Sequence, residues 1–134
     1  MRAVTSSQGS VLVSDHDEPT GTGELITVTS SGICGSDLHL IASGLSGVIL
    51  GHEFGGFTSN GTLVAVRPIG ECGSCPQCTS GFPHTCHLAL ASLNGTSING
   101  GLAEFVRVEP SRLVPVPAGT DPATVGLVEP LAVV

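Results

Sequence analysis

The sequence predicts a β-rich domain with a single modest core. Nineteen glycines and nine prolines interrupt the 134 residues too often for long helices. Between these breaks lie short aliphatic and β-branched runs, each about as long as a strand. The chain has no Trp or Tyr and only four Phe, so aliphatic side chains must supply most of the core. A chain of this length can bury one such core.

In the first half of the chain we expect three strands and one helix. Residues 10–14 (S-V-L-V-S) form a short strand before an acidic turn over residues 15–19. Residues 24–29 (E-L-I-T-V-T) form a β-branched strand that opens after the turn residues G-T-G. Residues 36–43 are expected to form a short helix with Ser36 or Asp37 as its N-cap. Residues 48–50 form a strand that leads into G-H-E.

In the second half we expect three more strands and a final helix. Residues 63–67 alternate as a half-buried strand does. A cysteine-rich loop follows, and residues 102–108 and 112–116 supply two further strands. The last segment begins with Asp121 as N-cap and Pro122 at the first helical position, so a helix is expected to run toward residue 134.

Charge and composition exclude some classes of function. The formal net charge is −7 with only four basic residues, which argues against binding to nucleic acid because phosphate neutralisation needs Lys and Arg. No basic patch suits an anionic membrane, and no apolar run approaches the length that spans one. The first residues carry no apolar segment of signal-peptide length. Together with reduced thiols, this predicts a cytoplasmic protein.

Four of the five cysteines lie within fifteen residues, in the run E-C-G-S-C-P-Q-C-T-S-G-F-P-H-T-C. Their spacing is C-x2-C-x2-C-x7-C, formed by Cys72, Cys75, Cys78 and Cys86. Two-residue gaps let neighbouring thiolates converge on one centre, and the longer return brings in the fourth. This spacing predicts a closed tetrahedral metal site that stabilises the fold and performs no catalysis itself.

Three other interpretations of these cysteines are open. Disulfides are disfavoured by the odd cysteine count and the absence of a secretory segment. An iron–sulfur cluster shares the opening C-x2-C-x2-C, but there the fourth cysteine follows after three residues and precedes proline. Free buried thiols would need apolar neighbours, which this Gly-, Pro- and Ser-rich run lacks. His84 and His87 flank Cys86 and are interpreted as surface residues.

Two further segments carry possible metal ligands. S-G-I-C-G-S-D-L-H contributes Cys34, and G-H-E-F-G-G contributes His52 and Glu53. A catalytic zinc takes about three protein ligands and keeps one position for water or substrate. Glu129, in V-E-P-L-A-V, could be a fourth ligand that comes and goes, and Asp37 is placed to accept the second ring N–H of His52.

Each of these residues has an ordinary interpretation when it is taken alone. A single buried Cys is most often a small hydrophobe. A His-Glu pair in a loop is usually solvated, and Ser before Asp commonly caps a helix. Only the combination with the four-cysteine run favours a second metal site.

In this order, G-I-C-G-S-D-L-H, G-H-E-x-x-G, C-x2-C-x2-C-x7-C and E-P-L-A-V resemble the zinc-dependent medium-chain alcohol/polyol dehydrogenases. The resemblance runs from about residue 23 to the last residue. It implies an amino-terminal GroES-like catalytic domain over residues 1–134, built as a partly open β-barrel. A lobe at about residues 70–88 would project from it and hold a structural zinc through the four cysteines.

The same resemblance implies roles for single residues. Cys34 and His52 would bind a catalytic zinc, with Glu53 as a direct or water-exchanged ligand. Glu129 matches a glutamate that lies at the metal or its water in polyol-type members. Ser36 would take the alcohol proton, and His39 would pass it toward solvent through the cofactor ribose. With both Glu53 and Glu129 present, the sequence resembles sorbitol, threonine or glucose dehydrogenases more than the enzymes that act on ethanol.

In this family a Rossmann domain follows and binds NAD or NADP. No G-x-G-x-x-G follows a strand in these 134 residues, so we expect no nucleotide-binding domain within them. Hydride transfer needs a positioned cofactor, and we therefore expect negligible dehydrogenase activity from this chain alone. The resemblance also implies two zincs per chain and a homo-oligomeric full-length enzyme that acts on a small alcohol or polyol.

Two other functions remain to be weighed against a zinc-dependent oxidoreductase. A non-enzymatic zinc-binding module would carry one zinc in the cysteine lobe. A zinc hydrolase would need a general base beside an open metal face, for which Glu53 or Glu129 could serve. Ser36 and His39 fit a proton relay for an alcohol better than they fit hydrolysis.

Overall fold

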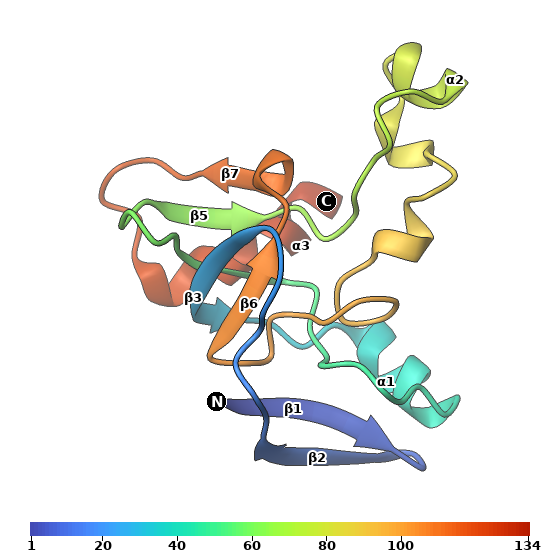
Figure 1. The fold of residues 1–134 in the computed structure, drawn as a ribbon, viewed down its shortest axis with the longest axis vertical. Coiled ribbons are helices and arrows are strands. Elements are labelled where there is room, and N and C mark those ends of the chain that lie inside the picture. The colour runs from blue at the N-terminus through green and yellow to red at the C-terminus, as the bar shows by residue number, and fades with distance from the viewer.

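The computed structural model describes all residues from 1 to 134 and contains two sheets (Figure 1). The larger sheet has five antiparallel strands in the order β6-β3-β4-β5-β7. Its strands are β3 (Glu24–Ser31), β4 (Phe54–Phe57), β5 (Leu63–Val66), β6 (Phe105–Val108) and β7 (Leu113–Pro115). No helix in the structure is both long and apolar enough to cross a membrane. The prediction of a mainly β domain with short helices is confirmed.

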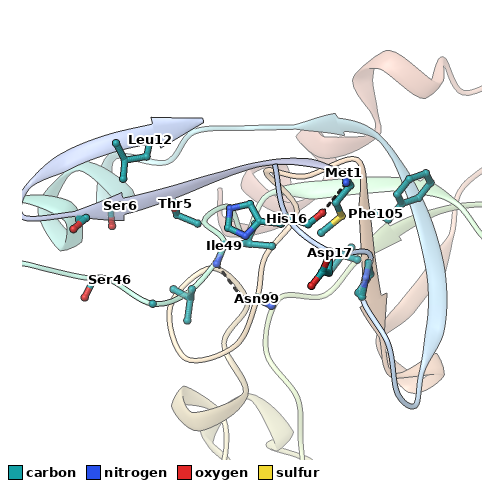
Figure 2. Close-up of a pocket in the computed structure, with 15 residues that line it drawn as sticks. Met1, Thr5, Ser6, Leu12, His16, Asp17, Ser46, Ile49, Asn99 and Phe105 are labelled. Carbon is teal, nitrogen blue, oxygen red and sulfur yellow. Dashed lines mark hydrogen bonds between the residues drawn. The ribbon is translucent and has the colours of Figure 1, made fainter. Parts of the chain in front are cut away.

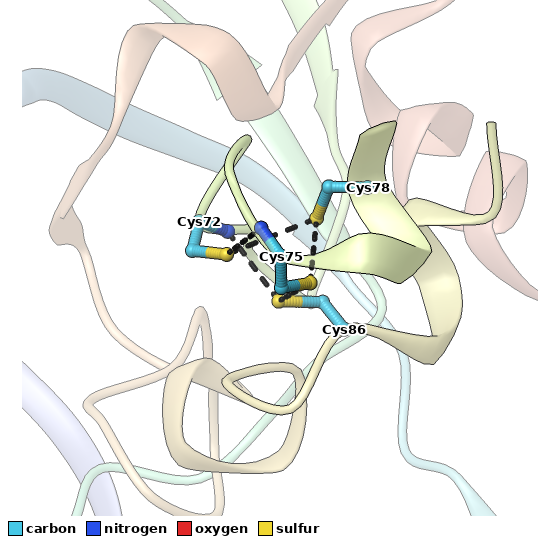
Figure 3. Close-up of side chains that lie close together, drawn as sticks. All are labelled: Cys72, Cys75, Cys78 and Cys86. Atoms are coloured by element: carbon cyan, nitrogen blue, oxygen red, sulfur yellow. Dashed lines mark hydrogen bonds between the residues drawn. The ribbon is translucent and has the colours of Figure 1, made fainter. Parts of the chain in front are cut away.

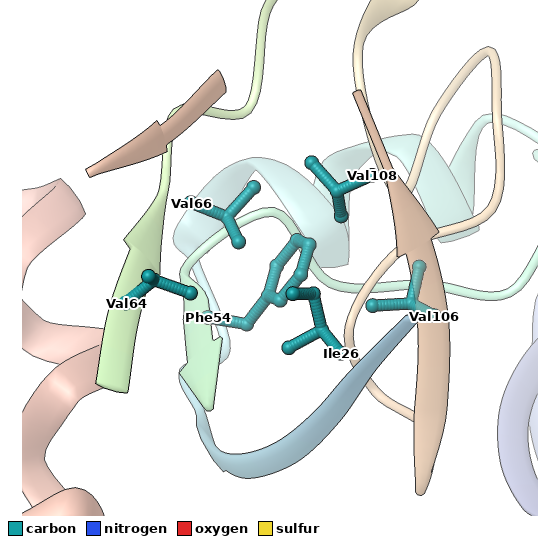
Figure 4. Packing of buried hydrophobic residues seen from close by; sticks show 6 residues of the cluster. All are labelled: Ile26, Phe54, Val64, Val66, Val106 and Val108. Atoms are coloured by element: carbon teal, nitrogen blue, oxygen red, sulfur yellow. The ribbon is translucent and has the colours of Figure 1, made fainter. Parts of the chain in front are cut away.

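The main core lies where the five strands curl toward one another (Figure 4). Its six members are almost fully buried aliphatic or aromatic side chains from four strands: Ile26, Phe54, Val64, Val66, Val106 and Val108. The four valines come from alternate positions of β5 and β6 and therefore point to one face of the sheet. Burial of each such side chain contributes about 1.5–3 kcal/mol.

Strand β4 was not predicted from the sequence F-G-G-F. Glycine is depleted in strands, which hides such a segment from propensity arguments. At Gly55 a side chain would meet Val125, because an added Cβ would lie 2.8 Å from the Val125 Cγ1. The glycine therefore lets the 3₁₀ helix η4 (Pro122–Leu127) pack directly on the sheet.

The smaller sheet is a hairpin of β1 (Arg2–Ser7) and β2 (Ser10–Asp15). The strand expected at residues 10–14 is confirmed, whereas β1 was not predicted. The strand expected at residues 48–50 is wrong: only Ile49 forms an isolated bridge, to Thr5. The Ile49 N–H binds the Asn99 side chain, 3.0 Å away, and the Leu50 N–H donates to the Val4 carbonyl of β1 at 2.9 Å, so the segment meets β1 without forming a continuous ladder.

The helices are short, as the glycine and proline content predicts. Helix α1 covers Gly35–Ala42 and α3 covers Val128–Val133. The final helical segment begins as predicted, with Asp121 accepting the Ala123 N–H at 2.9 Å, but its first turns are the 3₁₀ helix η4. The expected N-cap of α1 is corrected, because Cys34 occupies that position.

Residues 70–92 project away from the barrel (Figure 1). They contain α2 (Pro76–Thr79) and the 3₁₀ helices η1 (Pro83–Thr85) and η2 (Leu90–Ser92). A third 3₁₀ turn, η3 (Pro110–Arg112), places the buried Arg112 at the base of this projection. Its guanidinium donates to the carbonyls of Arg67 and Pro68 and to the Asn94 side chain, and so ties both ends of the projection to the barrel.

Candidate metal centres and the adjoining cavity

The four clustered cysteines converge on one point in the projecting segment (Figure 3). All four sulfurs lie within 4.8 Å of one another. Cys75 Sγ is 3.5 Å from Cys78 Sγ and 3.9 Å from Cys86 Sγ, and Cys72 Sγ is 4.0 Å from Cys78 Sγ. A tetrahedron with Zn–S bonds of about 2.3 Å has edges of about 3.8 Å. The thiols are therefore spaced for one ion.

The same distances decide against disulfides. All five cysteines are free thiols, and the closest pair of sulfurs is far beyond the disulfide bond length of about 2.05 Å. His84 and His87 are exposed and outside the ligand group, as interpreted from the sequence.

Backbone N–H groups orient the sulfurs. The Cys75 N–H donates to Cys72 Sγ at 3.3 Å, and the N–H groups of Cys72 and Leu88 donate to Cys86 Sγ at 3.4 Å. Cys75 caps α2, and Pro76 follows at the first helical position, where no N–H is needed. The chain between the cysteines thus turns in the way that the two-residue gaps require.

The environment separates the pKa values of the clustered thiols. The backbone N–H and hydroxyl of Ser74 lower the pKa of Cys72 to about 7, and the Cys78 N–H lowers the pKa of Cys75 to about 5. Burial and the neighbouring thiols raise the pKa of Cys78 to about 12. Crowded sulfurs cannot all ionise without a cation among them, and a divalent ion removes this conflict. The donor set fits zinc.

A second donor group joins two segments that lie far apart in the sequence. The ligand atoms of Cys34, His52 and Glu53 all lie within 4.8 Å of one another. Cys34 follows β3, and the other two residues precede β4. The Gly32 N–H donates to the Glu53 carbonyl at 2.6 Å, which holds the two segments together. Zinc accepts a thiolate, an imidazole and a carboxylate as ligands, and here one of each converges on the same point.

Gly51 allows the turn that presents His52. Its φ is +94°, a conformation that side chains rarely adopt, and an added Cβ would lie 2.8 Å from the backbone nitrogen of Leu102. The glycine in G-H-E is therefore required both for the backbone angle and for the close approach of another loop.

Asp37 contacts both segments, and its predicted role in orienting the His52 ring remains a prediction. It is 1% exposed, and its Oδ2 accepts the Cys34 N–H at 2.9 Å. Its Oδ1 lies 3.2 Å from His52 Nδ1, but the two groups are not aligned for a hydrogen bond. The other ring nitrogen, Nε2, is 3.5 Å from Ser36 Oγ and is left for the metal side.

Glu129 lies near this group without belonging to it. It is in the first turn of α3, and burial raises the pKa of its carboxyl, with a smaller lowering by His52 and a smaller rise from Glu53. It lines the same cavity as Ser36 and His52. This position suits a ligand that exchanges with water, which remains a prediction.

Ser36 and His39 lie one turn apart on exposed positions of α1. Side chains at this spacing share a helix face. Ser36 lines the cavity, whereas His39 is not among the lining residues. Their relay of a proton therefore also remains a prediction.

A cavity of about 740 Å³ adjoins the second donor group. It is lined by α1, β5, the base of the projection, β7 and α3. Of its lining residues, sequence analysis identified only Ser36, His52 and Glu129 as site residues. Only tertiary packing brings these elements together, and no motif marks them.

Another cavity, of about 560 Å³, lies between the β1–β2 hairpin and the loop around residues 46–49 (Figure 2). The amino terminus of Met1 donates to the His16 carbonyl at 2.7 Å along this cavity. Neither of the two donor groups in the structure borders it. It is therefore distinct from the metal centres.

Comparison with known proteins agrees with this architecture. The chain is 33% identical to the L-idonate 5-dehydrogenase (NAD(P)(+)) of Escherichia coli K12 across an alignment of 129 positions, which covers 83% of this chain and 38% of that protein. It is 30% identical to the sorbitol dehydrogenase of Halalkalibacterium halodurans across an alignment of 151 positions, which covers 98% of this chain and 43% of that protein. The chain thus spans about two fifths of the length of these relatives.

Solved structures show the same fold. The crystal structure of galactitol-1-phosphate dehydrogenase from Escherichia coli superposes with a TM-score of 0.90 at 29% identity, covering 99% of this chain and 43% of that one. This confirms the expected GroES-like fold. Residues 22–118 match the alcohol dehydrogenase GroES-like domain, and the chain belongs to that family.

Proposed function

We propose that this chain is the zinc-binding catalytic domain of an NAD(P)-dependent dehydrogenase that oxidises a secondary alcohol or polyol. One observation carries the proposal: a closed cluster of four thiols and a separate Cys–His–Glu group beside a cavity occur in one domain. A closed site serves the fold, whereas a site with room for a fourth ligand serves chemistry. The names of the relatives support the same reaction class.

In this proposal residues 70–88 form the structural-zinc lobe, and Cys34, His52 and Glu53 hold a catalytic zinc. When bound, that zinc supplies Lewis acidity, which lowers the pKa of a hydroxyl at the metal toward about 7. Asp37 keeps the His52 ring oriented through the 3.2 Å contact. Ser36 accepts the alcohol proton and His39 passes it to solvent.

The nicotinamide cofactor would bind to a Rossmann domain, as in the family that the chain belongs to, and receive the hydride there. This chain would contribute the metal and the proton relay but no cofactor site. We therefore propose that the 134 residues alone do not turn over an alcohol with NAD or NADP. Turnover of sorbitol with NAD by the purified chain would contradict this.

Metal counting tests the proposal. Elemental analysis of freshly purified chain is expected to return two zincs, of which one is lost in Cys34→Ser and the other in Cys86→Ser. A single zinc that only Cys86→Ser removes would favour a non-enzymatic zinc module. An esterase assay with a chelator control distinguishes the hydrolase alternative, for which the present proposal expects no metal-dependent rate.

A further inference from the structure

The cavity beside the second donor group also carries information about the substrate. Ser36, His52 and Glu129 belong to its lining, so a hydroxyl that reaches a metal held by Cys34, His52 and Glu53 would have its substituents in this cavity. We call the aliphatic residues of the rest of the lining the far wall. The cavity volume of about 740 Å³ lies within the range of small-molecule sites. The side chains of the far wall must then contact the part of the substrate that does not react.

The far wall is apolar. It is formed by aliphatic side chains from α1, β5, the base of the lobe, β7 and α3, including Leu40, Val66, Ile69, Leu93, Val114 and Val128. Polyol hydroxyls placed against such a surface lose water and gain no partner, which is unfavourable for each unpaired group. An apolar substituent gains from the same burial.

The cavity has no free cation for an acidic substrate. Arg67 is the only guanidinium among its lining residues. Its Nη1 donates to Glu71 Oε2 at 2.8 Å and its Nη2 to the Ser111 carbonyl at 3.3 Å. A carboxylate or phosphate in the cavity would have to compete with Glu71 for this group.

Few other hydrogen-bonding groups are available beyond the metal end. Thr96 lines the cavity, but its hydroxyl oxygen is buried without a partner. His84 borders the cavity from the exposed surface of the lobe. A sugar acid or an extended polyol carries hydroxyl groups along its whole length and would need many more hydrogen-bond partners than these.

We propose that the substrate of this site is a neutral secondary alcohol with an apolar substituent, and not a sugar acid or sugar phosphate. This inference rests on the proposed function. It separates this chain from the relatives named for L-idonate, L-galactonate and galactitol 1-phosphate. The inference is drawn from the apolar far wall and from the pairing of Arg67 with Glu71 in this chain.

Methyl NMR of the zinc-loaded chain tests the inference. We would titrate it separately with cyclohexanol, sorbitol and gluconate and follow the methyl groups of Ile69, Leu93 and Val114. Cyclohexanol is expected to shift these signals with a dissociation constant at least about tenfold below those of the other two, or about 1.4 kcal/mol. Equal or tighter binding of sorbitol or gluconate at these methyls would overturn the inference.

A pair of leucines provides a matched variant and control. Leu93 lines the cavity, whereas Leu90 is 77% exposed and does not. Leu93→Asn should weaken cyclohexanol binding about tenfold, and Leu90→Asn should leave it unchanged. Should Leu93→Asn fail to fold, Val114→Thr adds only a hydroxyl, in place of a methyl, at a 47% exposed position and should still weaken binding about threefold. Unchanged affinity in the folded variant refutes the assignment of the wall.

Further arms separate this inference from the proposed function. Two zincs with a preference for sorbitol would overturn the substrate class alone, whereas one zinc with a preference for cyclohexanol would overturn the proposed function alone. If nicotinamide mononucleotide shifts the same methyl signals with a lower dissociation constant than cyclohexanol, the wall would be assigned to the cofactor. Shifts that depend on protein concentration without ligand would assign it to a second copy. Either result overturns the inference.

Discussion

The two donor groups differ in how the chain assembles them. The four thiols come from fifteen consecutive residues, are oriented by backbone N–H groups, and leave no position open. The Cys34–His52–Glu53 group joins the start of α1 to the turn before β4 and lies beside a cavity. The first is assembled locally along the chain, whereas the second is positioned by the whole sheet.

This difference has an energetic consequence. The lobe buries only Cys75, Cys86 and Ala89 as its own small core, so we expect its order to depend on a bound metal. The second group is supported by the six-residue barrel core and by Asp37, and its backbone should persist without an ion. Metal loss should therefore unfold one region and only empty the other.

The largest effect is expected from Cys75→Ser. Loss of one of four thiolates should release the lobe zinc and lower the free energy of unfolding by at least about 5 kcal/mol, because metal binding and lobe folding are coupled. Hydrogen exchange should show loss of protection at the Thr79 and Ala89 amides, which the lobe now protects. If those amides stay protected in the zinc-free variant, the lobe folds independently of the metal.

A smaller effect is expected from Cys34→Ser. Zinc should fall from two to one per chain while the lobe amides keep their protection. With free zinc at about 100 times the dissociation constant, the variant should lose about 2.7 kcal/mol of stability through mass action alone. Thermal unfolding with and without a chelator measures this difference. Lobe unfolding in this variant would show that the two sites are not separate.

Asp37→Asn sharpens the comparison within the second group. The substitution weakens the contacts to His52 and to the Cys34 N–H, and zinc affinity at this site should fall about 10–100-fold. A chelator competition titration measures the change. Ser43→Ala is the matched control, because Ser43 Oγ bonds the His39 carbonyl at the other end of α1 and should affect the helix without affecting metal affinity.

The smallest expected effect is a change with pH in the number of protons released when zinc binds the metal-free lobe. At pH 8, Cys72 with a pKa of about 7 and Cys75 with a pKa of about 5 are largely ionised, whereas Cys78 with a pKa of about 12 still carries its proton. Because zinc binds thiolates, Cys78 must release a proton. Between pH 8 and pH 6 the release should rise as Cys72 becomes protonated, and zinc affinity should fall.

Calorimetry in buffers of different ionisation enthalpy counts these protons, with Cys34→Ser used so that only the lobe site binds. A release that stays constant from pH 8 to pH 6 would contradict the low pKa of Cys72.

Strand prediction succeeded where side chains alternate and failed where glycine or tertiary contacts decide. β3 and β5 carry β-branched or alternating aliphatic residues and were predicted close to their observed bounds. β4 is F-G-G-F: Gly55 is explained by the packing of η4 on the sheet, and Gly56 by the close approach of the β3 backbone at Thr27. Residues 48–50 have strand-like composition, but beyond one bridge to Thr5 and one bond to Val4 their backbone groups bind Asn99 and the loop over residues 100–102.

The sequence by itself determined the cysteine cluster, since a chain with gaps of two residues can bring sulfurs onto one centre through local turns. It also indicated the second ligand set through the resemblance of its motifs. Only the tertiary structure decided that Cys34 and His52 meet, that Asp37 bridges them, and that the adjoining wall is apolar. These facts depend on which distant segments the antiparallel sheet places side by side, and no local spacing encodes that pairing.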